Sequence, residues 1–341
     1  MIITRTPFRV SLFGGGTDYP AWCNEHGGAV LGFAIDRYCY ITLRHLPPFF
    51  EYKHRVVYSR IETVQDASEI GHPVVRAALG EFDFREGLEI HHDGDLPARS
   101  GLGSSSSFTV GLLNALHALR GQSCTKDQLA KEAIHVEQRL LAENVGLQDQ
   151  VWAAHGGFNR IEFGADRFTV MPLIVPRARL ENLMSHLVLY FTGFSRFSSD
   201  VAKESIRAIP SKHQELSTMY EMVSEAQSII CNLNTPISEV GHLLHEGWKL
   251  KRSLSASVAT PAIDDIYAAG RDAGAIGGKL LGAGGGGFLL FFVEPEKREA
   301  LRARLSNLIE VDIDVDFDGS RVMLFEPDGF RSRVKGRSWA A

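Results

Sequence analysis

The first segment that could do chemistry is rich in glycine and serine: positions 101–107 read GLGSSSS, within residues 97–107. We expect this segment to follow a strand and to open a helix. Free N–H groups at a helix N-terminus, with the macrodipole behind them, bind anions. Serine hydroxyls there can add hydrogen bonds or coordinate Mg²⁺. A serine-capped helix after a loop is the simpler alternative. The pattern favours a phosphate site made by Gly101, Leu102, Gly103, Ser104, Ser105, Ser106 and Ser107.

Two further segments concentrate glycine, at residues 14–16 and at residues 282–287, which read GAGGGG. Glycine serves where the backbone approaches a ligand or adopts a positive φ. Three such segments favour one large polyanionic ligand over three unrelated turns. Residues 282–287 match GxGxxG, but they run into an apolar strand and not into the helix of a dinucleotide fold. No GxxxxGK[ST] sequence occurs, which excludes a P-loop NTPase.

Two acids are candidates for roles beside a phosphate site. Glu137 lies on the apolar stripe of a predicted helix, where a carboxylate must be paired, protonated or bound to a cation. A rim position that reaches water is the alternative, and Mg²⁺ is the natural partner beside phosphate. Asp149 lies in GLQDQ, residues 146–150. It either stabilises the first turn of a helix through the dipole or accepts a proton from a substrate hydroxyl. Periodicity does not separate these two readings.

The elements that must position these residues mix strands and helices in the first half. The patterns predict strands over 29–35, 39–43, 88–92, 158–163 and 168–173. A helix is expected from Ser104 to about Arg120, and a capping box at residues 125–128 opens the next.

In the second half we expect a strand over 186–192, a helical region over 198–255 that breaks near Pro210 and Pro236, and a helix opened by Pro261. Strands flank the last glycine segment. A helix over 295–309 leads to an alternating strand over 311–317. A boundary near residue 180 gives domains 1–180 and 181–341.

Composition limits the function classes. The 341 residues correspond to roughly two domains, and 44% hydrophobic with 23% charged residues excludes a disordered chain. The net charge of −5 gives no electrostatic reason to expect nucleic acid or a membrane surface as a partner. The apolar stretch 280–293 is too short to span a bilayer. Four separated cysteines favour reduced thiols and a cytoplasmic location.

Taken together and in this order, the motifs resemble those of the GHMP kinases, the family of galactokinase, homoserine kinase and mevalonate kinase. PFRVSLFGGGTDY at 7–19 is similar to the substrate motif, residues 97–107 to the phosphate loop, and KLLGAGGGG at 279–287 to the C-terminal glycine motif. The resemblance implies a sugar kinase with an α+β fold. Its N-terminal domain would be ribosomal-S5-domain-2-like and its C-terminal domain ferredoxin-like. ATP, Mg²⁺ and a small-molecule sugar phosphate are the implied ligands.

The resemblance also implies a role for each matching position. Asp149 would be the catalytic base, and Arg9 the cation near the reacting hydroxyl and the γ-phosphate. Ser105 and Glu137 would hold Mg²⁺, and Asp18 would bind sugar hydroxyls. The other substrate-binding positions that it implies are Gly15, Gly16, Thr17, Gly284 and Gly285.

One departure from galactokinases narrows the substrate. They carry GEHTDY, and here Gly15 and Gly16 replace the Glu-His pair, which removes two sugar-contacting side chains. GGGTDYP followed by HGGAV at 26–30 is similar to the D-glycero-D-manno-heptose 7-phosphate kinases. Those enzymes phosphorylate the anomeric hydroxyl on the way to nucleotide-activated heptose for surface polysaccharide. Fucokinase-like enzymes are the nearest rival. A sugar sensor or a superfamily decarboxylase fits less well, because the catalytic positions and the polyol motif remain.

A 7-phosphate on the substrate requires cations far from the reacting hydroxyl. The candidates in the second half are Arg196 and three cations on one predicted helix, Lys249, Lys251 and Arg252. Lys249 and Arg252 share a helix face, whereas Lys251 points elsewhere. Arg196, Lys249 and Arg252 are therefore the predicted phosphate-binding residues, with a solvated helix face as the alternative for the last two.

Overall fold

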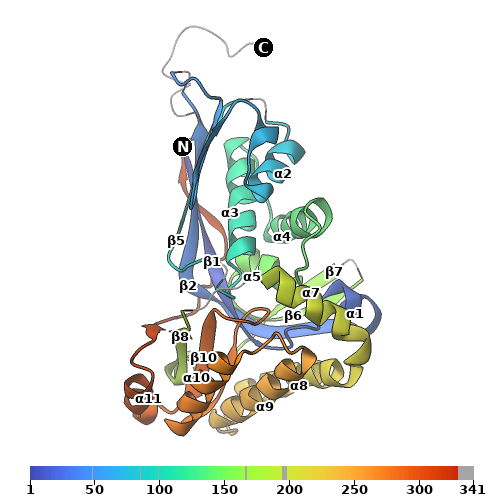
Figure 1. Ribbon diagram of the computed structural model, residues 1–341, viewed down its shortest axis with the longest axis vertical. Coiled ribbons are helices and arrows are strands. Elements are labelled where there is room, and N and C mark those ends of the chain that lie inside the picture. The colour runs from blue at the N-terminus through green and yellow to red at the C-terminus, as the bar shows by residue number, and fades with distance from the viewer. Residues whose placement is uncertain (48, 85, 99, 166, 194–197, 329–341) are drawn as a thin grey trace.

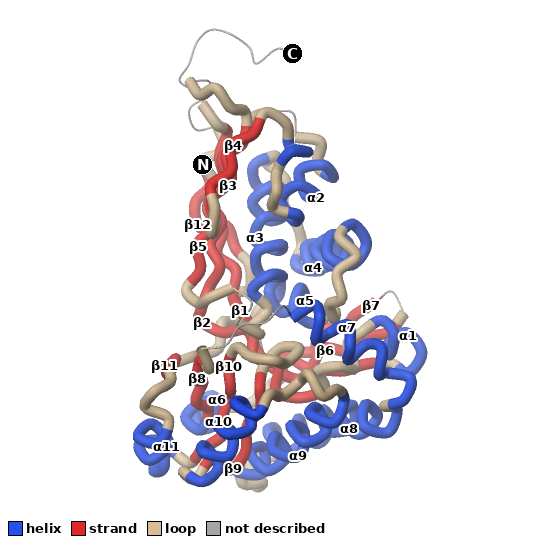
Figure 2. Tube along the Cα trace, in the orientation of Figure 1, coloured by secondary structure: helices blue, strands red, loops and turns tan. Residues whose placement is uncertain are grey.

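Two β-sheets organise the chain in the computed structural model, which describes residues 1–47, 49–84, 86–98, 100–165, 167–193 and 198–328. Within these residues the larger sheet has the strand order β12-β1-β2-β5-β3-β4, with β6 beside β2 and β7 beside β6. The smaller sheet has the order β11-β8-β10-β9. Figure 2 shows the larger sheet extending away from the smaller sheet and from the helices that lie around the smaller sheet.

Helices α2, α3, α4 and α5 lie on one face of the larger sheet (Figure 1), and α8 also contacts its strands β1 and β2. Helix α3 packs on β1 and β2, and contacts α2, α4 and α5. The strands are β1 (Ile2–Phe13), β2 (Gly28–His45), β3 (His54–Val57), β4 (Ile61–Val64), β5 (Leu88–Gly94), β6 (Phe158–Gly164), β7 (Arg167–Pro172) and β12 (Arg321–Phe325). The helices are α1 (Pro20–His26), α2 (Pro73–Glu81), α3 (Ser104–Leu119), α4 (Lys126–Ile134) and α5 (Gln148–His155), with a 3₁₀ turn at Ala67–Glu69 and a π-helical turn at His135–Leu140.

The smaller sheet is antiparallel throughout. Its strands are β8 (Leu187–Phe191), β9 (Ala275–Leu280), β10 (Phe288–Val293) and β11 (Ile309–Val311). Its helices are α6 (Arg177–His186), α7 (Ser198–Ala208), α8 (His213–Cys231), α9 (Ser238–Leu254), α10 (Pro261–Asp272) and α11 (Arg298–Arg304), with 3₁₀ turns at Ile209–Ser211 and Pro295–Lys297. Numbered along the chain, the strand order is 4-1-3-2, the ferredoxin-like arrangement. The expected α+β fold is confirmed.

Most predicted elements agree with these bounds, including the helix breaks near Pro210 and Pro236. The strands predicted over 29–35 and 39–43 are one strand, β2, whose pairing with β1 shifts between Pro7 and Phe8. The strand predicted over 311–317 is wrong. β11 ends at Val311, and Val315 forms an isolated bridge with Ile35. The aspartates of this stretch accept nearby backbone N–H groups, which competes with strand pairing.

The two halves of the chain are joined to each other at two places. β12 comes from the end of the described chain, yet it pairs with β1 in the larger sheet. The main apolar core also joins residues of both halves, such as Leu31 and Leu290. The division at residue 180 therefore stays a proposal, in which β12 returns to the first domain. Within the described ranges, no helix combines the length and the apolar character that a membrane span needs. All four cysteines are free thiols.

Candidate active site

A cavity lies where the three glycine segments meet, and ten of the predicted site residues line it. Those residues are Arg9, Gly15, Gly16, Asp18, Gly101, Gly103, Ser104, Ser105, Ser106 and Asp149. The second half contributes Gly282 and Ala283 from the last glycine segment. The sequence therefore identified most of one wall, and the fold brings segments that are more than 260 positions apart to the same place.

The phosphate-loop wall is the N-terminus of α3. Its N-cap residue is Gly103 at φ 77°, a left-handed conformation that favours glycine, and no side chain caps the terminus. The N–H of Ser107 donates to the carbonyl of Gly103, which begins the helical ladder. The N–H groups of Ser105 and Ser106, which precede it, have no acceptor inside the helix. This terminus opens on the cavity, with Ser105 exposed, and it has the geometry of an anion site.

The last glycine segment packs directly on the phosphate loop. A Cβ at Gly101 would lie 2.6 Å from the carbonyl oxygen of Leu281, and a Cβ at Gly282 would lie 2.5 Å from Cα of Gly101. The N–H of Phe288 donates to the carbonyl of Ser100 at 3.2 Å. Side chains at Gly101 or Gly282 would therefore push the two halves apart at the cavity.

Gly284 and Gly285 are buried and do not line the cavity. A Cβ at Gly284 would lie 2.7 Å from Cα of Val258, and the N–H of Gly285 donates to the carbonyl of Val258 at 2.9 Å. These two glycines let the segment pack on the chain that follows α9. In this structure Gly284 and Gly285 support the packing of the last glycine segment and do not contact the cavity.

Arg9 and Asp149 form a bidentate ion pair in the cavity wall. Arg9, on β1, donates from Nε to Oδ1 and from Nη2 to Oδ2 of Asp149, on α5, both at 2.7 Å. Its Nη1 donates to the carbonyl of Gly101 at 2.7 Å. The Arg9 side chain is 5% exposed and that of Asp149 26%. Each carboxylate oxygen keeps a second lone pair. Asp149 also borders the phosphate loop, since a Cβ at Gly103 would lie 3.4 Å from its Oδ2.

Asp18 lines the cavity as a buried acid. Its Oδ1 accepts the N–H of Gly16 at 3.0 Å, and its Oδ2 accepts the N–H of Gln148 at 3.3 Å. Burial raises the pKa of the Asp18 carboxyl, and these two hydrogen bonds oppose the shift. Thr17, beside it, is fully buried, and its hydroxyl bonds the carbonyls of Gly14 and Ala29. Thr17 thus shapes the loop, while Asp18 is the group that a ligand can reach.

Glu137 lies behind the phosphate loop, fully buried. Burial raises the pKa of its carboxyl to about 7. Its Oε2 accepts the hydroxyl of Ser106 at 2.9 Å and the side-chain amide of Gln150, and its Oε1 has no partner among the described residues. A buried carboxylate with an open oxygen, beside serine hydroxyls, is an all-oxygen donor set that fits Mg²⁺. The serine in contact is Ser106, and Ser105 is exposed to the cavity.

Two predicted phosphate-loop residues face the interior. The carbonyl of Leu102 accepts the backbone N–H of Arg9 at 3.0 Å, and the hydroxyl of Ser107 donates to the carbonyl of Pro7 at 2.8 Å. Both residues are buried and neither lines the cavity. They fasten the loop to β1 and so help to hold Arg9 in place.

The structure does not bring the predicted 7-phosphate ligands to the cavity. Lys249 is exposed and pairs with Glu246 at 2.8 Å, and Arg252 pairs with Asp264 at 2.6 Å on the outer side of α9. Arg196 lies outside the described residues. The expectation for Lys249 and Arg252 is therefore replaced by that of a solvated face, because α9 packs its opposite face on β9.

Two lysines outside the predicted set line the cavity: Lys251 on α9, which sequence reasoning set aside because it points away from Lys249 and Arg252, and Lys279 on β9, which it did not consider as a site residue. Burial holds the pKa of Lys251 well below its usual range and lowers that of Lys279 to about 7. Nearby Arg9 lowers both pKa values further, and Asp18 acts in the opposite direction. A signal for Lys251 was available, since it continues the buried stripe Val240, Leu244, Trp248.

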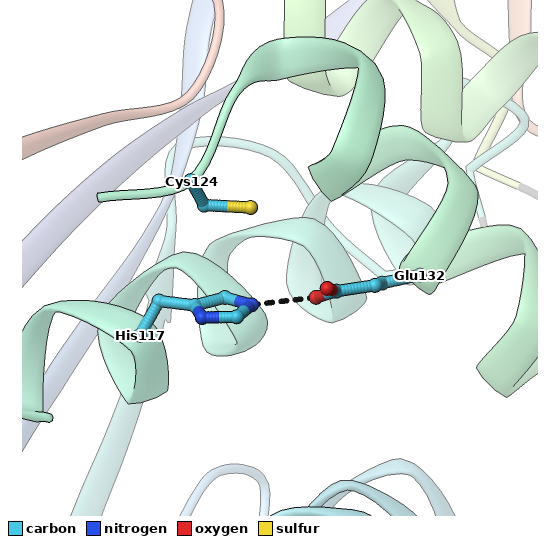
Figure 3. A group of neighbouring side chains, drawn as sticks. All are labelled: His117, Cys124 and Glu132. Atoms are coloured by element: carbon cyan, nitrogen blue, oxygen red, sulfur yellow. Dashed lines mark hydrogen bonds and ion pairs between the residues drawn. The ribbon is translucent and has the colours of Figure 1, made fainter. Parts of the chain in front are cut away.

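A second group of possible metal ligands lies away from this cavity, at His117, Cys124 and Glu132 (Figure 3). Nε2 of His117 and Oε2 of Glu132 are 2.6 Å apart. Two ligands of one tetrahedral Zn²⁺ would stand roughly 3.3 Å apart. The pair is therefore a hydrogen bond in this structure, and it ties α4 to α3.

Known proteins resemble the chain in sequence and in structure. It matches the GHMP kinases N terminal domain over residues 67–157 and the GHMP kinases C terminal domain over residues 231–310. D-glycero-alpha-D-manno-heptose 7-phosphate kinase from Campylobacter jejuni is 30% identical over 308 residues, which cover 87% of this chain and 91% of that protein. L-fucokinase/L-fucose-1-P guanylyltransferase from Bacteroides fragilis is 27% identical, over 88% of this chain and 35% of that protein.

Among solved structures, a putative sugar kinase from Campylobacter jejuni has a TM-score of 0.71 and 28% identity, covering 94% of this chain and 97% of that one. A D-glycero-D-manno-heptose 1-phosphate kinase from Bacteriodes thetaiotaomicron has a TM-score of 0.75 at 24% identity, covering 96% and 100%. Each matched stretch contributes to the cavity wall, Ser105 and Asp149 from the first and Lys251 and Lys279 from the second, while Arg9 precedes both stretches.

Proposed function

Because the chain belongs to the GHMP kinases and is a sugar kinase of that family, we propose that it phosphorylates D-glycero-D-manno-heptose 7-phosphate. The γ-phosphoryl group of ATP would pass to the anomeric C1 hydroxyl and give the 1,7-bisphosphate, an intermediate for nucleotide-activated heptose and surface polysaccharide. The observation that carries the chemistry is the Arg9–Asp149 pair, which borders the uncapped N-terminus of α3 in one cavity. The relative named for this substrate, matched over 91% of its length, supports the sugar.

In this proposal each wall of the cavity has a task in phosphoryl transfer, which depends on positioning and charge neutralisation. The N–H groups at the start of α3 hold the phosphates of ATP. Asp149 accepts the proton of the C1 hydroxyl. The oxygen of that hydroxyl bonds to the γ-phosphorus, and the bond between the γ-phosphorus and the leaving ADP oxygen breaks. Arg9 holds the Asp149 carboxylate in place and offers positive charge beside the transferred group. Asp18 binds hydroxyls of the sugar.

Glu137 and a serine of the phosphate loop would hold Mg²⁺, which neutralises phosphate charge when it is bound. The family resemblance assigns the serine ligand to Ser105, whereas Ser106 is the residue that contacts Glu137. Alanine variants of each serine separate the two assignments. Replacement of the serine that binds Mg²⁺ raises the Mg²⁺ concentration at half-maximal activity, and replacement of the other serine leaves that concentration near the parent value.

A fucokinase-like sugar 1-kinase is the second candidate, favoured by relatives named for fucokinase activity that are 27% identical over about nine-tenths of this chain. Its substrate has no phosphate. The two candidates therefore differ in whether the cavity binds an anionic or a neutral sugar.

The test is ADP release, coupled to a continuous assay, with heptose 7-phosphate, unphosphorylated heptose, fucose, galactose and mevalonate as acceptors. We expect the highest kcat/KM on heptose 7-phosphate and a new anomeric phosphate signal in the ³¹P spectrum of the product. Preparations of the Asp149→Asn variant control for contaminating kinases. A higher kcat/KM on fucose, or a phosphate on another hydroxyl, would refute the proposal.

A further inference from the structure

Two buried lysine side chains in the cavity wall have no task in the reaction as proposed above. Nζ of Lys251 donates to the carbonyls of Leu280 and Gly282, at 2.7 and 2.5 Å, and Nζ of Lys279 donates to the carbonyl of Leu12 at 2.8 Å. The two residues are 8% and 6% exposed. Lysine is almost never buried to this extent without a paired charge, so the arrangement needs an explanation.

No carboxylate among the described residues neutralises either lysine through an ion pair. Asp149 is taken by Arg9, and Asp18 accepts two backbone N–H groups. An ammonium has three N–H donors, so the contacts above leave one donor on Lys251 and two on Lys279. A buried charge without a partner is costly, and an anion in the cavity would remove that cost.

The position of the lysines favours an anion on the acceptor and not on ATP. Asp18, the residue given to sugar hydroxyls, is a carboxylate whose charge acts on both lysines, as does the charge of Arg9. Lys279 reaches the carbonyl of Leu12, two residues before the glycine segment that continues to Asp18. The start of α3, which would hold the phosphates of ATP, is supplied with its own N–H donors. The described cations that line the cavity are these two lysines and Arg9, and Arg9 is paired.

We propose that Lys251 and Lys279 together form the binding site for a phosphate monoester carried by the acceptor sugar, and so select a phosphorylated sugar over a neutral one. The inference rests on the proposed function and deepens it. In their ammonium form, which a bound anion stabilises, the two lysines match a phosphate dianion in charge and in hydrogen bonding. The site replaces the exposed face of Lys249 and Arg252 as the place of the second phosphate.

The first experiment compares Lys251→Met, Lys279→Met and the double variant with the parent. Methionine keeps the length and the apolar stem while it removes the charge. Lys249→Met is the matched control, since it removes an exposed ammonium from the same helix. Each variant is assayed on heptose 7-phosphate and on unphosphorylated heptose at saturating ATP, and its KM for ATP is measured separately at a fixed concentration of the sugar. Binding of heptose 7-phosphate is also measured by calorimetry without ATP.

Each single variant should lose roughly 10- to 100-fold in kcat/KM on heptose 7-phosphate, the loss expected for a charge-assisted hydrogen bond. It should stay within about threefold of the parent on unphosphorylated heptose, at an unchanged KM for ATP. The double variant should lose calorimetric binding of heptose 7-phosphate, and the Lys249→Met control should keep both activities. Equal losses on the two sugars, or a rise in the KM for ATP alone, would overturn the inference and assign the lysines to the transferred phosphate.

Two further outcomes keep the inference separate from the proposed function. A parent that does not turn over heptose 7-phosphate refutes both. A parent that does, with lysine variants that lose no selectivity, refutes the inference alone. If the methionine variants do not fold, the unaltered chain is acetylated briefly and analysed by peptide mass spectrometry. Heptose 7-phosphate should protect Lys251 and Lys279 while heptose should not, and equal protection or none would contradict the site.

Discussion

Replacement of Asp149 by Asn is the sharpest test of the proposed chemistry, because it changes charge with little change in shape. In the structure both carboxylate oxygens accept a hydrogen bond of 2.7 Å from Arg9. Asparagine keeps one acceptor and replaces the other with an NH₂ group, which cannot take a proton from a hydroxyl. The variant therefore removes the base and leaves part of the contact that holds Arg9.

Two magnitudes follow from this geometry. Loss of a general base lowers turnover about 10²- to 10⁴-fold, which corresponds to about 3–5 kcal/mol of transition-state stabilisation. Loss of one charge-assisted hydrogen bond in the pair costs folding stability about 1–3 kcal/mol. The loss of activity should thus far exceed any loss caused by unfolding at the assay temperature. Binding of ATP should stay close to that of the parent, because the start of α3 is unchanged.

The assay is single-turnover phosphorylation with the variant in excess, together with equilibrium binding of ATP and thermal unfolding. Asp127→Asn is the matched control, since Asp127 is an exposed carboxylate on α4 that contacts His155. The control should keep the parent's turnover. If Asp149→Asn retains more than a tenth of the activity, Asp149 is a structural partner of Arg9 and not the base. A parallel loss of ATP affinity would instead show that the pair acts by holding the phosphate loop.

Three further predictions concern the metal, the pH and the glycine contact. Glu137→Gln should raise the Mg²⁺ concentration at half-maximal activity, as should Ser105→Ala if that serine is the ligand; titration curves like the parent's would place the metal elsewhere. Because the pKa of Lys279 is about 7 in the fold and ordinary when unfolded, the unfolded chain holds more protons from about pH 7 to 10. Because of this group, the parent's free energy of unfolding should rise over that range by up to about 1.4 kcal/mol per pH unit. Below pH 7 Lys279 is charged in the folded chain as well, so the full cost of burying its charge remains. Lys279→Met should lack that component in denaturant titrations. Gly282→Ala should weaken ATP binding and lower stability more than Gly121→Ala, which has the same left-handed φ but open space around its Cβ; equal effects on unfolding and ATP titrations would contradict the contact.

The parts of the fold that could be predicted are those with a one-sided apolar pattern. The helices between residues 198 and 304, the turn into α10 at Pro261 and the hairpin of β6 and β7 all have it. β1 lacks it, because most of its residues are buried on both faces and Pro7 lies in its middle, where proline disfavours a central strand. The stretch over 311–317 alternates perfectly, yet its aspartates bond the local backbone and end the strand at Val311. Alternation predicts a strand only when side chains do not satisfy the backbone first.

For the site, motifs could predict chain positions but not the direction of each side chain. Ser106 and Ser107 are adjacent in one motif, yet one contacts Glu137 and the other the carbonyl of Pro7. The ion pair of Arg9 and Asp149 joins residues 140 positions apart, and no spacing in the sequence indicates it. Such contacts depend on how α3 and α5 lie on β1, which is a property of the packed fold.

The lysines of α9 show the same limit at the level of one helix. Helical spacing separates Lys249 and Arg252 from Lys251, but it does not say which face is turned inward. The contact between α9 and β9 decides this, because Gly241 and Gly277 bring the two backbones so close that a Cβ at Gly277 would lie 1.9 Å from the Gly241 carbonyl oxygen. That contact fixes the rotation of the helix and places Lys251 in the cavity wall. If α9 were turned by half a revolution, Lys249 and Arg252 would be buried. Trp248 would be exposed, and the burial of a large apolar side chain stabilises a fold by about 1.5–3 kcal/mol. The cation that the fold turns inward is thus selected by the packing of glycines and apolar side chains, and not by the number of charges on a face.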